Sequence, residues 1–168
     1  MAVHYPNEKD NEYDRLLEFW TNVEALRKYG KENDLNNEAL DEFIEKVNNN
    51  AEYIEDWLDN IEENRGSLDS FFEPLSQSER RKDTYFYTQA VQVLTQQKAK
   101  RFVLRIYAIR IDVNTYLITG GAIKWSQKMQ DHPDTKRELE KLQHVLNFIT
   151  QQGVFDTESL IDLQNELQ

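Results

Sequence analysis

Apolar side chains recur at helical spacing through the first third of the chain. Between residues 11 and 29 they return every three or four positions, so we predict a helix that ends at Gly30 and is built on Tyr13, Leu16, Leu17, Trp20, Val23 and Leu26. The same spacing resumes at Leu40 and again at Ile54, with three asparagines at residues 48–50 between the two stretches. Because asparagine favours turns, we predict two antiparallel helices joined at this triplet.

The middle of the chain favours strands. Residues 84–94 are dense in aromatic and β-branched side chains, and residues 101–112 alternate apolar with semi-polar positions. We predict a strand in each segment. A turn at residues 112–114 then pairs the second strand with residues 116–119 as an antiparallel hairpin.

Glycine and proline mark the limits of these strands. Gly120 and Gly121 follow the hairpin, where they end the strand, bulge it, or allow another group to approach its backbone closely. Pro74 lies in a short extended segment at residues 71–75, which it restricts to the edge of a sheet because proline has no backbone N–H.

Two further helices are predicted after residue 132. Thr135 and Glu138 match a capping box, and Gly153 ends the apolar stripe that follows them. A last helix begins near Thr157 with Asp156 as its cap. The stripe of the first of these helices consists of Leu139, Leu142, Val145, Leu146 and Ile149.

These elements predict an α+β fold: a helical hairpin packed on a small antiparallel sheet, with extra helices at both ends. We expect one domain over residues 1–168, with an N-terminal extension at 1–35, a core at 36–150 and a last helix at 154–168. No apolar run approaches the roughly 20 residues that span a bilayer, and no leader pattern opens the chain, so we predict a cytoplasmic protein without a membrane partner. The absence of cysteine excludes thiolate chemistry.

Charge divides the chain into two parts. Residues 1–66 hold seven basic and eighteen acidic side chains, whereas residues 67–168 hold thirteen of each. Within the second part, residues 79–128 hold ten basic side chains against three acidic ones. This local excess favours a polyanion partner there, although the net charge of −11 repels one over the chain as a whole.

The basic part carries LRIY at residues 104–107, followed by GAIK at residues 121–124 on the next strand. Over roughly residues 38–150, this pattern and the order of elements resemble the RelE/ParE/HigB toxin superfamily, in which a strand with an arginine beside an apolar-tyrosine pair precedes a strand with a basic end. The resemblance implies a RelE/ParE-like fold and a ribosome-associated mRNA endonuclease. Such an enzyme needs neither metal nor small-molecule cofactor, and its partners are mRNA, the ribosome and an antitoxin protein.

The resemblance also implies a set of site residues. The catalytic set is Arg105, Tyr107 and Lys124, and the RNA-binding set is Arg101, Arg110 and Lys128. Cationic side chains on the sheet would stabilise the charge that develops at the scissile phosphate, while the RNA 2′-hydroxyl acts as nucleophile. Where HigB-like proteins tend to place two lysines, this chain has Lys124 followed by Trp125.

Charge also supports a second hypothesis. The eighteen carboxylates of residues 1–66 raise the electrostatic cost of approaching RNA. No Glu-x-x-His pair accompanies the acidic side chains of the predicted hairpin, so we assign them to a solvated face and not to a metal site. The alternative is a non-catalytic interaction protein on the same fold, which binds a protein partner through its acidic helices. The helix at residues 11–29 either extends the core or occupies the place of an antitoxin.

Overall fold

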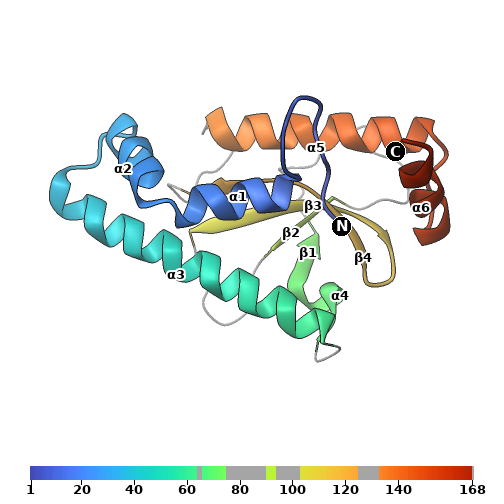
Figure 1. Ribbon diagram of the computed structural model, residues 1–168, viewed down its shortest axis with the longest axis horizontal. Helices are drawn as coiled ribbons and strands as arrows, with labels where there is room; N and C mark the ends of the chain where they lie inside the picture. The colour runs from blue at the N-terminus through green and yellow to red at the C-terminus, as the bar shows by residue number, and fades with distance from the viewer. Residues whose placement is uncertain (64–65, 75–89, 94–102, 125–132, 168) are drawn as a thin grey trace.

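The computed structural model describes residues 1–63, 66–74, 90–93, 103–124 and 133–167. In chain order, its elements are α1 (Glu12–Thr21), α2 (Val23–Glu32), α3 (Asn37–Glu62), α4 (Leu68–Phe71), β1 (Phe72–Pro74), β2 (Ala90–Val93), β3 (Leu104–Asp112), β4 (Thr115–Ile123), α5 (Pro133–Gln151) and α6 (Thr157–Glu166). The sheet lies between two helical layers, with α1 and α3 on one face and α5 and α6 on the other (Figure 1). The predicted α+β class is confirmed.

The sheet is antiparallel, with the strand order β1-β2-β3-β4. Its longest pairing is the predicted hairpin of β3 and β4, which turns at Asn114, a residue with a φ angle of 56°. The strand β4 continues through both glycines, and it contains a bulge just before them. Tyr107 pairs with Gly120 whereas Ala108 pairs with Ile118, so Thr119 is the extra residue of the bulge.

The two edges of the sheet are formed in different ways. Pro74 lies on the edge strand β1, as its missing N–H predicts. At the other edge the first residues of the chain run along β4: the Val3 N–H donates to the Ile118 carbonyl oxygen at 2.9 Å, and the Ile118 N–H donates to the Met1 carbonyl oxygen at 2.8 Å. Of the strand predicted at residues 84–94, Ala90–Val93 is confirmed as β2, and the rest lies outside the described residues.

The break between helices lies at Asn22 and not at the predicted asparagine triplet. The Asn22 N–H donates to the Phe19 carbonyl oxygen at the end of α1, and its side chain accepts from the Ala25 N–H at the start of α2. The predicted helical hairpin with a turn at residues 48–50 is wrong, because α3 runs unbroken through it. Its buried stripe passes through Val47 and Ala51, so packing outweighs the weak turn preference of the asparagines.

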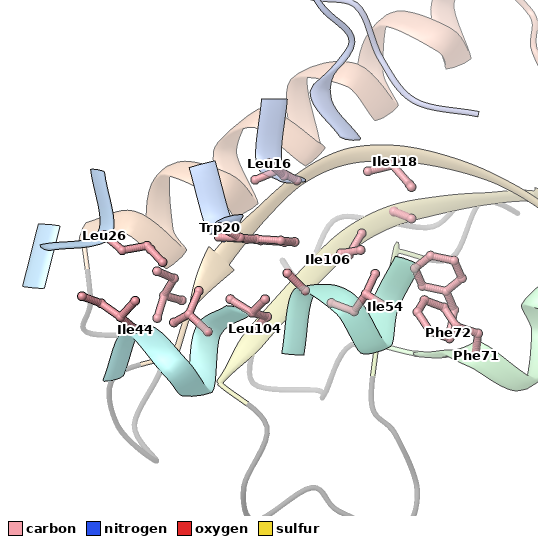
Figure 2. Packing of buried hydrophobic residues seen from close by; sticks show 14 of the residues in the cluster. Leu16, Trp20, Leu26, Ile44, Ile54, Phe71, Phe72, Leu104, Ile106 and Ile118 are labelled. Carbon is pink, nitrogen blue, oxygen red and sulfur yellow. The ribbon is translucent and has the colours of Figure 1, made fainter. Parts of the chain in front are cut away.

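The first helix extends the core. Leu16 and Trp20 of α1 and Leu26 of α2 are buried against α3 and the sheet residues Leu104 and Ile106 (Figure 2). Burial of such side chains is the main favourable term in folding. Of the two roles that the sequence left open for residues 11–29, the structure therefore supports the extension of the core.

The second helical layer covers the opposite face of the sheet. Its cluster joins strand residues to α5 and α6 and consists of Tyr107, Ile109, Ile111, Leu117, Ala122, Leu142, Leu146, Ile149, Val154, Leu160 and Leu163. The predicted Thr135–Glu138 capping box is wrong, because α5 already begins at Pro133 and the Glu138 carboxylate binds elsewhere. The predicted cap at Asp156 is confirmed, as is the stop at Gly153, whose φ angle is 76°.

Candidate functional site

The structure brings two of the predicted RNA-site residues to one face of the sheet. Arg105 pairs with Ala122, and the Lys124 N–H donates to the Val103 carbonyl oxygen at 2.5 Å. Alternation along the two strands directs the Arg105 and Lys124 side chains to the face that carries α5. Both side chains are half-buried, and each already interacts with other residues.

The other predicted site residues are not brought to this place. Tyr107 is 0% exposed and belongs to the core under α5. Arg110 lies on the opposite face, where its Nη2 is 3.2 Å from Oδ2 of Asp69 on α4. Arg101 and Lys128 lie outside the described residues. Within the described part of the chain, the predicted set therefore does not form one basic patch.

Asp69 binds Arg110 on this opposite face. The Asp69 carboxylate accepts from the Tyr116 hydroxyl at 2.7 Å, from Arg110 and from the Asn114 backbone N–H at 3.4 Å. Burial, and then the contact with Asp69, raise the pKa of Tyr116 to about 12. These bonds fasten α4 to the turn of the hairpin, so Arg110 has a structural role.

A second group of charges is buried between α1, β4 and α5. The Lys141 ammonium group donates to Glu12 Oε1 at 2.5 Å and to Glu138 Oε2 at 2.9 Å, and Arg15 Nε donates to Glu12 Oε2 at 3.2 Å. Glu12 is 1% exposed and Glu138 is 6% exposed. We call Glu12, Glu138 and Lys141 the buried charge network.

Two glycines make room for this network. A Cβ atom at Gly120 would overlap the Glu138 carboxylate, and the Gly121 N–H donates to Glu138 Oε2 at 3.2 Å. This is the close backbone approach that the sequence left open for the glycine pair. Burial raises the pKa of Glu138 above its ordinary value, although Lys141 acts in the opposite direction. Since both carboxylates are nearly shielded from solvent, the network joins α1 to α5 and does not offer a ligand site.

The outer face of α3 carries many exposed acidic side chains. Nine carboxylates on this helix are exposed: Glu38, Asp41, Glu42, Glu45, Glu52, Glu55, Asp56, Asp59 and Glu62. Among the described residues, only Asp41 of this set has an ion-pair partner, Arg27 at 3.1 Å. The described residues contain no group of three or more side chains that is arranged to bind a metal ion. We call these nine carboxylates the acidic face.

An open pocket of about 320 Å³ lies beside the C-terminal part of α3. Its polar lining comes from Asn11, Tyr13, Glu62 and Tyr116, and its apolar lining from Met1, Ala2, Leu58, Ile61, Leu68, Phe72 and Ile118. Three separate parts of the chain meet here: the N-terminal segment with the start of α1, the end of α3 with α4, and the edge of the sheet. The pocket is mainly apolar, with one exposed carboxylate, Glu62, at its margin.

Three further carboxylates act electrostatically on Tyr13, which lines this pocket. Burial raises the pKa of Tyr13 above its ordinary value, and the negative charges of Glu55, Asp59 and Asp14 raise it further. The charges of α3 therefore act on a group that lines the pocket. We call this site the anionic pocket: the apolar hollow together with Glu62 and these three carboxylates.

Sequence reasoning identified the acidic face but not the anionic pocket. The helical period and the excess of acids were visible in the sequence, whereas the pocket depends on contacts between residues more than 100 positions apart, such as Ala2 with Ile118. Comparison of the chain with protein-family models, with curated proteins and with solved structures gave no match. The likeness to the toxin superfamily thus stays a prediction from the sequence.

Proposed function

We propose that this protein is a non-catalytic interaction protein that binds a positively charged protein partner through the acidic face of α3. The observation that carries the proposal is the row of nine exposed carboxylates on one helix of 26 residues, against one lysine, Lys46. A surface of this kind attracts a cationic partner and repels nucleic acid.

The acidic face works against folding, which supports a role in recognition. Glu52 lies three and four positions from Glu55 and Asp56, and the same spacings recur along the helix. Like charges at these spacings destabilise a helix by about 0.2–0.5 kcal/mol per pair. A bound cationic partner reduces this repulsion between carboxylates. The free energy that the repulsion costs the folded helix therefore favours binding of the partner.

The test is a titration with a defined cationic probe. A twelve-residue peptide of alternating arginine and serine is added to the ¹⁵N-labelled full chain, and amide shifts and fluorescence anisotropy are recorded over a range of salt concentrations. We expect the shifts to concentrate on α3 and the affinity to fall as salt rises. The proposal is wrong if the peptide does not bind or if the shifts lie elsewhere.

A matched pair of variants separates the acidic face from net charge. Three exposed glutamates of α3 are replaced in Glu42→Gln/Glu45→Gln/Glu52→Gln, and three exposed glutamates outside it in Glu140→Gln/Glu158→Gln/Glu166→Gln. Because exposed ion pairs contribute about 0.2–1 kcal/mol each, we expect the first triple variant to weaken binding about fivefold or more. Equal weakening by the second would show that only net charge matters.

Binding and cleavage of mRNA at the end of the hairpin are a second candidate function. The placement of Arg105 and Lys124 on one face of β3 and β4 favours it, since two cations at one place suit a phosphate. The test is expression of the chain in a bacterial host beside matched Arg105→Ala and Lys124→Ala variants, with translation rate as the readout. Growth arrest that either substitution removes would support the toxin-like activity, whereas normal growth with soluble protein would contradict it.

A further inference from the structure

The anionic pocket combines two features that call for two kinds of partner side chain. Its interior is apolar, with Leu58 and Ile61 of α3 and Leu68 of α4 half-buried around it. Such a hollow favours an aliphatic or aromatic side chain, because burial removes apolar surface of both partners from water. Arginine or lysine alone would leave this interior poorly filled.

The margin of the pocket is negatively charged and therefore favours cationic groups of a partner. Glu62 lines it directly, and Glu55, Asp59 and Asp14 act on Tyr13 in its wall. When a partner places an apolar side chain in the hollow, the partner residues on either side of it lie close to these carboxylates. Cationic neighbours are favoured there and acidic ones are excluded.

We infer that the anionic pocket is the anchor point for a basic peptide segment in which an apolar side chain is flanked by arginines or lysines. The apolar side chain enters the hollow, and the flanking cations contact Glu62, Asp59 and Glu55. The inference rests on the proposed function and deepens it. An anchor at one end of the acidic face would fix the position of the bound peptide along α3 and would select peptides that carry an apolar side chain.

Two peptides of equal charge test this anchor. The first carries a single leucine between two pairs of arginines, and the second carries serine in place of that leucine. Anisotropy with the full chain should show tighter binding of the leucine peptide by about tenfold or more, as expected for burial of one leucine side chain. Equal binding would overturn the anchor while leaving the acidic face intact, whereas no binding of either peptide would overturn the proposed function as well.

Two charge reversals on exposed positions of α3 locate the contact. Glu62→Lys changes the margin of the pocket, and Glu45→Lys makes the same change about 25 Å away along the helix. Lysine near a helix C-terminus is favourable for the helix dipole, so Glu62→Lys should leave the fold intact. We expect Glu62→Lys to weaken the leucine peptide at least fivefold more than Glu45→Lys does. An equal effect of the two reversals would show that the peptide lies along the helix without using the pocket.

A variant that fills the hollow gives an independent check. Leu58→Trp places a larger side chain at the pocket wall, so the leucine peptide should lose its advantage over the serine peptide while the serine peptide keeps its own affinity. Circular dichroism and the amide spectrum establish that the variant is folded. If the advantage persists in folded Leu58→Trp protein, the pocket is not the anchor.

Discussion

Carboxylates occupy two contrasting regions of this protein. In the buried charge network, Glu12 and Glu138 share Lys141 and are almost shielded from solvent, whereas the carboxylates of the acidic face are exposed and mostly without ion-pair partners in the described residues. A buried charge is costly unless it is paired and hydrogen-bonded, whereas an exposed charge costs little. The same chemical group therefore holds two helices together in one region and is available to a partner in the other.

The largest expected effect is on stability, when the buried charge network loses its cation. Lys141→Met removes the cation that both carboxylates share, and we expect it to lower the free energy of unfolding by about 3–5 kcal/mol. Lys136→Met changes an exposed lysine on the same helix and is the control. Urea denaturation measures both variants, and a loss under about 1 kcal/mol for Lys141→Met would contradict the structural role.

A smaller effect appears in the pH dependence of stability. Because the pKa of Glu138 is raised in the folded state, the folded protein holds a proton there at pH values where the unfolded chain has released it. Lowering the pH from neutral to about 4.3, the ordinary glutamate value, should thus favour the folded state, and this contribution is lost as the pH rises through the folded pKa. Glu138→Gln lacks the titrating group.

The measurement is the difference in unfolding free energy between the wild-type protein and Glu138→Gln across that range. We expect the difference to move in favour of the wild type as the pH falls, by at most about 1.4 kcal/mol per pH unit. A difference that is flat, or that moves the other way, would show that Glu138 is ionised in the folded state down to ordinary pH values. The constant part of the difference reports the lost ion pair with Lys141.

The smallest expected effect concerns the exposed region. The triple variant Glu42→Gln/Glu45→Gln/Glu52→Gln removes five like-charge pairs at spacings of three or four residues, so we expect it to raise the free energy of unfolding by about 1 kcal/mol. Thermal denaturation at low and high salt measures this, and the gain should shrink at high salt. A loss of more than about 1 kcal/mol would show that the acidic face takes part in folding, which would remove the contrast between the two regions.

Local patterns were sufficient to predict much of the fold. The hairpin of β3 and β4, the edge position of Pro74 and the cap at Asp156 depend on residues close in sequence, and all three were predicted. The helix break at Asn22 and the unbroken helix through residues 48–50 were not, because asparagine favours caps and turns but is also tolerated at exposed helical positions. Only the packing of Val47 and Ala51 against the core decides between them.

The candidate sites divide in the same way. The exposure of the acids on α3 follows from helical period, so the sequence located that surface. The resemblance also implied a catalytic role for Tyr107, because strand alternation separates two faces without showing that α5 covers the second one. The sequence assigned Glu138 to a capping box for a similar reason. Its carboxylate accepts from the Gly121 N–H, and this contact between α5 and β4 cannot be predicted from residues that are close in sequence.

The pairing of the first residues with β4 has a consequence for synthesis on the ribosome. Met1 and Tyr116 are bonded across 115 positions, so this edge of the sheet cannot close until the hairpin has left the exit tunnel. Until then Leu16 and Trp20, which the finished sheet covers, have no strand to pack against. During that interval these two side chains can pack only against the helices of their own layer, so this part of the core is completed only once β3 and β4 have been made.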